Sequence, residues 1–224
     1  MSFLAKVFQL YIERWPWFLE LLGEQLRISL ISVALAAAIG MLLGIFIAAR
    51  PRFAEPVMAV CNLFYTIPAI ALIGLLIPLI GIGEKNAIAA IVLYGIMPMV
   101  RNTYTGLTNI DKSTVDAAVG LGSTRAQLLL RIRLPLAASV ILAGLRNVAV
   151  MSIATGSIAA FVGGGGLGEA IFRGITMYNT AMTFAGSRML VMDAGRVLQF
   201  DTPEQIRACP ATELVKTLVS GKEI

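Results

Sequence analysis

Ionisable side chains that could do chemistry are scarce, and the usual catalytic groups are missing. The 224 residues include 18 Lys and Arg, 13 Asp and Glu, two Cys and no His. Without His the sequence lacks the commonest general base, the Ser/His and Cys/His nucleophile arrangements and most zinc sites. It also contains no Gly-x-x-x-x-Gly-Lys-Ser/Thr phosphate loop. We therefore expect no enzyme activity, no metal and no cofactor on this chain.

Seven residues between positions 116 and 135 form the most specific pattern of the sequence. They are Asp116, Ala117, Ala118, Gly122, Ile132, Leu134 and Pro135. A short helix that begins near Ser113 or Thr114 places Asp116 in its first turn, where a carboxylate favours the positive end of the helix dipole. The two alanines that follow give a small surface on which another protein can seat closely.

The rest of this pattern predicts a rigid knob that joins two helices. Gly122 permits a sharp reversal of the chain, and Pro135 suits the first turn of the next helix. Such a knob suits docking to a second protein rather than catalysis of a covalent step. An ordinary amphipathic connector is the alternative interpretation.

The elements that hold this knob are expected to lie in a membrane. Hydrophobic residues make up 58% of the chain and charged residues 14%, and the mean hydropathy is +0.83. A soluble domain of this size could not cover so much apolar surface. The net charge of +5 does not indicate nucleic acid, because the basic residues lie in short loops beside apolar segments. We predict an all-α polytopic membrane protein.

Four apolar segments are long enough to cross about 30 Å of hydrocarbon as helices. They span approximately residues 26–49, 57–82, 87–105 and 135–162. The second contains Pro68 and Pro78, which kink a helix and suit a segment that lines protein or a cavity. Arg146 interrupts the fourth. Either residues 134–145 lie partly outside the membrane, which we favour, or Arg146 faces the interior of the bundle.

Basic loops set the expected orientation of these segments. Arg50 and Arg52 place the loop between the first two spans in the cytoplasm. The basic residues of the loop 109–135 place that loop on the same side. Residues 1–22 then lie outside. They are rich in aromatic residues and contain no signal peptide, so they are predicted to form an interfacial amphipathic helix.

The pattern from Asp116 to Pro135 resembles the EAA loop of bacterial ABC importer permeases, which is Glu-Ala-Ala, three residues, Gly, nine residues and Ile-x-Leu-Pro. The spacing matches throughout, and the one departure is Asp116 in place of Glu. The resemblance implies a MetI-like helical bundle over residues 23–184, with several spans in the bacterial cytoplasmic (inner) membrane. It also implies that the loop seats on an ABC ATPase subunit, that a second permease copy or paralogue completes the pathway among membrane lipids, and that an extracytoplasmic binding protein delivers the substrate.

Further segments resemble permeases for osmoprotectants, namely glycine betaine, carnitine and choline. They are FYTIPAIALIGLLIPLIGIG (64–83), MPMVRNTYTGL (97–107) and GGGGLGEAIFRGI (163–175). This resemblance implies an ATP-driven importer for quaternary ammonium compounds. Methionine importer permeases are similar in the glycine-rich segment, so a methionine or other amino-acid permease is an alternative. A truncated subunit that does not transport is another, because the family expects a further span where the tail begins.

Residues near Pro68 and in the glycine run 163–168 are candidates for the transport pathway or its gate. They are Tyr65, Pro68, Gly163, Gly164, Gly165, Gly166 and Gly168. The glycine run is either a flexible outer turn near the gate or a helix C-cap followed by a loop. Tyr65, Tyr94 and Tyr104 could offer π-faces to a quaternary ammonium ion, although aromatic residues in spans more often serve packing.

Residues 185–224 change in character and are predicted to form a short soluble α/β tail in place of the last span. Met189 to Phe200 alternates like two strands around a turn, and Thr202 to Gln205 is typical of a helix start. The stretch 187–219 resembles the segment of an ABC ATPase subunit after its switch histidine. We expect a junction between a permease and the end of an ATPase; the alternative is an unusual entry of residues 170–192 into the membrane.

Overall fold

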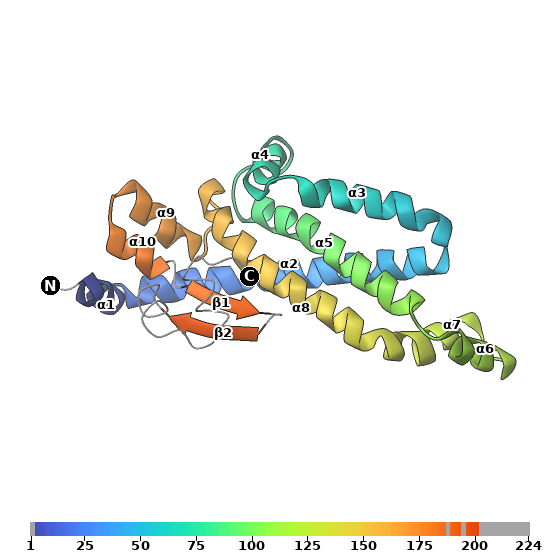
Figure 1. The fold of residues 1–224 in the computed structure, drawn as a ribbon. Coiled ribbons are helices and arrows are strands. Elements are labelled where there is room, and N and C mark those ends of the chain that lie inside the picture. Colours follow the sequence, from blue (N-terminus) through green and yellow to red (C-terminus); the bar gives the residue numbers. More distant parts are fainter. Residues whose placement is uncertain (1–2, 187–188, 194–195, 202–224) are drawn as a thin grey trace, which may run out of the picture. The chain divides into compact units, whose positions relative to one another are not determined.

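The computed structural model describes residues 3–186, 189–193 and 196–201 (Figure 1). The chain divides into two compact units, residues 25–164 (the bundle unit) and residues 1–24 with 165–224 (the terminal unit). The elements in chain order are α1 (Phe3–Glu13), α2 (Trp15–Ala49), η1 (Pro51–Phe53), α3 (Ala54–Thr66), α4 (Ala69–Ile80), α5 (Glu84–Thr108), α6 (Lys112–Gly120), α7 (Arg125–Gln127), η2 (Leu128–Arg133), α8 (Leu134–Ala159), η3 (Ala160–Val162), α9 (Gly168–Thr176), α10 (Thr180–Gly186), β1 (Met189–Asp193) and β2 (Arg196–Asp201).

Small residues let the long helices of the bundle unit pack closely, and α5 contacts both α2 and α8. A Cβ atom added at Gly95 would lie 2.7 Å from the Cβ of Ala36 in α2 and 2.9 Å from Cγ1 of Val148 in α8. A Cβ added at Gly44 would lie 2.5 Å from the Cβ of Thr103. Because lipid gives helices no hydrophobic reason to associate, such close approach is what holds them together.

The second predicted span is broken rather than kinked. α3 ends at Thr66 and α4 begins at Ala69, and the two helices are bent by 101°. Ile67 between them is extended, with ψ of 130°, because the ring of Pro68 disfavours the helical conformation in the residue before it. Among the described residues, three helices are long and apolar enough to cross a membrane, or four if this bent pair counts as one span.

The first helical boundary lies at Arg14 rather than near residue 22. α2 runs unbroken for 35 residues from Trp15, which at 1.5 Å per residue is about 52 Å and exceeds a hydrocarbon core of about 30 Å. Pro16 has no N–H to donate to the preceding turn, so it starts a new helix instead of continuing α1. The predicted interfacial segment is therefore divided between α1 and the start of α2.

Arg146 lies on the surface of the bundle unit. The helix that contains it is continuous from Arg125 to Val162, over 38 residues, or about 57 Å. The arginine side chain is exposed, so the alternative that turned it into the interior of the bundle is wrong for this unit. The helix is long enough to leave its first turns outside the hydrocarbon.

The terminal unit is a helical hairpin, α9 and α10, packed on the N-terminal helices. Its hydrophobic cluster is formed by Val7, Phe18, Leu21, Ala170, Ala181 and Ala185. The hydroxyl of Tyr11 donates a hydrogen bond to the carbonyl of Ala185, and the guanidinium of Arg173 lies 5.4 Å from the ring centre of Trp17. These contacts place a folded hairpin over residues 168–186.

Two strands are present where the sequence predicts the tail to begin. β1 and β2 pair as an antiparallel hairpin in which Met189 faces Asp201 and Asp193 faces Arg196, where the sequence predicts two strands. The helix predicted from Thr202 lies outside the described residues. A soluble α/β tail over residues 185–224 is therefore not supported.

Candidate functional site

The loop 109–135 forms a short helical hairpin at one end of the bundle unit, where α6 and α7 lie beyond the ends of α5 and α8 (Figure 1). Asp111 caps the first of these helices. Its carboxylate accepts hydrogen bonds from the backbone N–H of Ser113, at 3.3 Å, and from the Ser113 hydroxyl, at 2.5 Å. Both hydrogen bonds lower the pKa of Asp111 below its ordinary value, and the bond from the Ser113 hydroxyl has the larger effect.

Asp116 does not occupy the position that the sequence predicts for it. Because α6 begins at Lys112, Asp116 lies in the second turn and Asp111 is the carboxylate at the positive end of the helix. Asp116 and Ala117 are exposed, whereas Ala118 is buried. Only one of the two alanines is therefore available to a partner protein.

The turn between α6 and α7 requires glycine. Gly122 has a φ of +82°, a conformation in which most side chains are strained. Its N–H donates to the carbonyl of Val119 at 2.9 Å, and that of Ser123 donates to the carbonyl of Ala118 at 3.1 Å. These two bonds are a Schellman ending, so the predicted reversal at Gly122 is where the chain turns.

The return segment of the loop is fixed at its start and widened before Pro135. Thr124 and Gln127 form a reciprocal capping box, with distances of 2.9 and 3.3 Å. Residues 128–133 are π-helical. Pro135 cannot donate an N–H, and its ring would crowd the carbonyl of Arg131 in a regular helix; the wider turn accommodates both. Ile132 and Leu134 are half-buried, and Pro135 is exposed.

Three apolar side chains that the sequence pattern does not include are exposed around this loop. Val119 is 55%, Leu121 89% and Leu130 63% exposed. Water-exposed apolar side chains grouped on one projection are typical of a protein interaction surface. The sequence does not single them out, because the loop also contains apolar residues that are half-buried, such as Leu128 and Leu129.

Removal of the cap on α6 gives the first testable prediction. Asp111→Ala should speed hydrogen exchange of the α6 amides about fivefold, because the first turn loses its acceptor. Asp111→Asn, which can also cap a helix, is the matched control and should leave exchange nearly unchanged.

Since the pKa of Asp111 is lowered in the folded loop, its ionic stabilisation is present above the ordinary pKa of an aspartate and is lost as the pH falls through the lowered value. Equal exchange in both variants would show that the cap has no role.

The glycine run ends the last long helix. Gly163 has a φ of +69°, and the N–H of Gly164 donates to the carbonyl of Ala159 at 2.9 Å. A Cβ on Gly164 would lie 2.8 Å from that carbonyl oxygen. The C-cap alternative thus describes this part of the run, and the gate stays a prediction.

The remaining glycines belong to the terminal unit. Gly165 and Gly166 have φ of +76° and +79°, and the N–H of Gly166 donates to the carboxylate of Glu24 at 2.9 Å. Gly168 opens α9. This part of the run is a tight turn held by a carboxylate.

Two of the three tyrosines lie together. The rings of Tyr65 and Tyr94 are 6.0 Å apart, next to the break before Pro68. Tyr65 is 40% exposed. Tyr104 packs against a different cluster, around Ile47. A cage of all three around one cation is therefore not present in the bundle unit.

Comparison with known proteins gives related sequences over most of the chain. Residues 40–194 match the model of a family described as "Binding-protein-dependent transport system inner membrane component". The match includes the whole loop 109–135 and extends beyond residue 184, where the predicted permease domain ends.

Named relatives are transport permeases. A carnitine transport permease protein of Listeria monocytogenes is 36% identical over 188 residues, which are 84% of each chain. A choline transport system permease protein of Bacillus subtilis is 36% identical over 73% of this chain and 76% of its own. An ergothioneine transport permease/ergothioneine binding protein of Helicobacter pylori is 42% identical over 70% of this chain. That match spans 29% of the longer Helicobacter protein.

Solved structures show a similar fold. The chain resembles a subunit of the MetNI methionine ABC transporter in its inward-facing conformation, with a TM-score of 0.68, 24% identity and coverage of 75% of this chain and 86% of the other. The predicted all-α, MetI-like bundle is confirmed. At this identity the likeness concerns the fold alone.

Proposed function

The chain belongs to the family of inner membrane components of binding-protein-dependent transport systems, and we propose that it serves the ATP-driven import of solutes that carry a quaternary ammonium group. It is a permease with several spans in the inner membrane. Members of the family are transport subunits rather than enzymes. Hydrolysis of ATP is therefore assigned to a partner.

The choice of substrate class rests on the relatives. One observation carries it: the match to the carnitine permease covers 84% of both chains. Carnitine, choline and ergothioneine, which the relatives' names give, all carry a trimethylammonium group.

The loop 109–135 is proposed as the site that receives the ATPase subunit. It projects from the bundle, its turn is fixed by hydrogen bonds on both sides of Gly122, and it presents exposed apolar side chains at Val119 and Leu121. A projection that is rigid transmits displacement, whereas a flexible loop would absorb it. Asp116, Ala117, Gly122 and Pro135 are the exposed members of the predicted pattern. We assign Asp116, Ala117 and Pro135 to the contact and Gly122 to the turn.

The proposed mechanism is alternating access. Two permease subunits, identical or paralogous, form the pathway, and an extracytoplasmic binding protein delivers the solute. Closure of the two ATPase subunits on ATP draws the two loops together and opens the spans outward. The continuous helix from Arg125 to Val162 carries that movement from the loop to the outer side.

Competition during uptake tests the substrate class. Cells that express the chain with its partner ATPase and binding protein take up labelled choline, and unlabelled carnitine, glycine betaine, ergothioneine or methionine is added in about hundredfold excess. We expect one or more of the trimethylammonium solutes to suppress uptake by about tenfold or more, and methionine to have no effect.

Three outcomes separate the proposal from its alternatives. Labelled methionine taken up in place of choline, and suppressed only by methionine, would move the chain to the amino-acid permeases. Absence of any ATP-dependent uptake in a correctly inserted complex would identify a subunit that does not transport. Uptake that continues after ATP is depleted would indicate a pore.

A further inference from the structure

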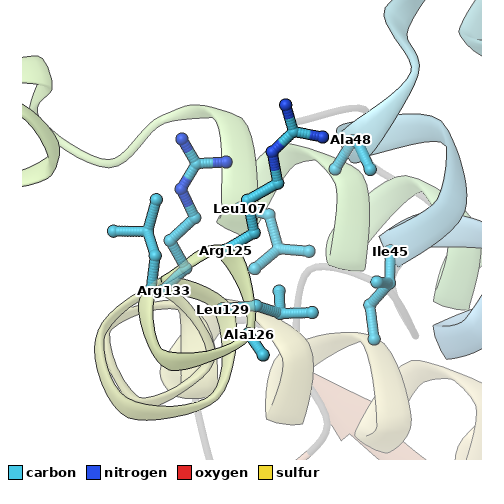
Figure 2. A pocket seen from close by; sticks show the side chains of 9 residues that line it. Ile45, Ala48, Leu107, Arg125, Ala126, Leu129 and Arg133 are labelled. Carbon is cyan, nitrogen blue, oxygen red and sulfur yellow. The ribbon is translucent and has the colours of Figure 1, made fainter. Parts of the chain in front are cut away.

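A cavity of about 580 Å³ lies behind the loop, between the ends of α2 and α5 and the first turns of the helix that begins at Arg125. It is lined by Ile45, Ala48, Ala49, Leu107, Arg125, Ala126, Leu128, Leu129 and Arg133. Figure 2 shows the side chains of Arg125 and Arg133 extending in the same direction from this helix, with Ile45 and Ala48 on the facing helix. The lining thus combines two guanidinium groups with an aliphatic wall.

Within the part of the chain that the structure describes, the two arginines have no acidic partner. None of the nine lining residues is acidic, and among the described residues neither arginine forms one of the ion pairs. Nε of Arg133 is buried without a hydrogen-bond partner. Two like charges that face one cavity repel each other. An anion bound between them would remove this repulsion and satisfy the buried donor.

The cavity lies at the level where the helices leave the hydrocarbon. Arg27 and Glu84 form an ion pair of 2.6 Å at the opposite end of the bundle unit, which marks the other polar boundary. α5 starts at Glu84 and has 25 residues, or about 37 Å, so its last turn lies beyond a core of about 30 Å. Leu107 is in that turn, and Ala49 is the last residue of α2. The cavity therefore lies at headgroup depth.

From this arrangement we propose that the cavity binds an anionic phospholipid of the leaflet on the loop side, with the phosphate held by Arg125 and Arg133. Guanidinium groups bind phosphate oxygens in a bidentate manner, and basic pockets on the cytoplasmic side of membrane proteins bind anionic headgroups. The wall formed by Ile45 and Ala48 suits the first carbons of an acyl chain. Free phosphate could use the arginines but gains nothing from that wall.

The site is placed to influence the loop. Arg125 is the first residue of α7, directly after the turn at Gly122–Thr124, and Arg133 is the last residue of the π-helical segment. A lipid held by both side chains would brace the return helix of the knob against the end of α2. The lipid is thus expected to stabilise the loop without touching its exposed apolar side chains.

Lipid titration with charge-matched variants tests the proposal. The full chain, purified in detergent, is titrated with short-chain phosphatidylglycerol or phosphatidylcholine and observed by native mass spectrometry. Arg125→Gln/Arg133→Gln should weaken binding of phosphatidylglycerol about tenfold, since each arginine near a membrane surface contributes appreciably to binding of anionic lipid. Arg50→Gln/Arg52→Gln, which removes the same charge at the same end of the bundle outside the cavity, should change it less than about twofold.

Further arms exclude other occupants. Phosphatidylcholine should show no such difference, and tens of millimolar inorganic phosphate should not displace the lipid. The proposal would be overturned if both double variants weakened binding of phosphatidylglycerol equally, or if neither weakened it. Displacement of the lipid by phosphate would assign the cavity to the free anion. A Gln variant that keeps its lipid but loses the ATPase subunit would assign the arginines to that protein. If the Gln variant fails to fold, Arg125→Lys/Arg133→Lys is used in its place. This variant should bind phosphatidylglycerol a few times more weakly than the unmodified chain does. An unchanged affinity would contradict the site.

Discussion

Replacing Gly95 with leucine is expected to lower the melting temperature of the detergent-solubilised chain by about 10 °C. The new side chain would meet Ala36 on one side and Val148 on the other, both already closer than 3 Å to an added Cβ. Overpacking of this kind costs about 1–3 kcal/mol per site, and 1 kcal/mol corresponds to roughly 2–4 °C in a chain of this size. Scanning fluorimetry in detergent measures the shift.

Gly74→Leu is the matched control for that experiment. Gly74 also lies within a helix, α4, but a Cβ added there has no atom within 4 Å. The two substitutions add the same apolar volume and the same helix propensity, so they differ only in packing. Similar melting temperatures for both variants would show that α2, α5 and α8 do not pack as described here.

Replacing Gly122 with valine is expected to reduce stimulation of the partner ATPase by the loaded binding protein about tenfold. Gly122 has a φ of +82°, which costs a β-branched residue about 1–3 kcal/mol, so the turn would open and α6 would lose its orientation. The rate of ATP hydrolysis in liposomes, with and without the binding protein, measures the effect.

Two further variants interpret the result at Gly122. Gly120→Val makes the same substitution two residues earlier, at a helical position with no atom within 4 Å, and should retain most of the stimulation. Gly122→Asn should retain more than Gly122→Val, because asparagine tolerates the left-handed conformation. If Gly120→Val is as damaging as Gly122→Val, surface contact rather than backbone geometry determines coupling.

The turn of the loop could be predicted from sequence because its determinants are local. Gly122 ends α6 through its backbone conformation, and Pro135 restricts the helical turn that precedes it. The residue types and their spacing are therefore sufficient to predict the turn. The sequence predicts a start of α6 near Ser113 or Thr114, whereas the helix begins at Lys112, because Asp, Ser and Thr can each cap a helix. Asp111 is the residue that caps it, through its hydrogen bonds to Ser113.

The fold of residues 54–80 shows where periodicity fails. The apolar composition is continuous through Pro68, so the sequence favours one span, and a proline alone indicates only a kink. A bend of 101° needs partners for both halves. Leu72 and Ile73 of α4 are buried with Tyr94 of α5, contacts that join residues far apart in sequence and carry no local signal.

The basic cavity could not have been predicted for the same reason. Arg125 and Arg133 in a basic loop are expected from the positive-inside bias, and the sequence gives no reason to separate them from Arg50 or Arg131. Their distinction comes from the end of α2, which brings Ile45 to face them. Chemistry that depends on residues from three helices appears only after the bundle has formed.

Coupling through the loop is tested most directly by replacing it. Residues 111–124 are exchanged for a Gly/Ser segment of equal length, and the chain is reconstituted with its ATPase and binding protein in liposomes. We expect stimulation of ATP hydrolysis by the loaded binding protein and uptake of the trimethylammonium solute both to be abolished. Stimulation and uptake at wild-type levels with the flexible segment in place would contradict the account.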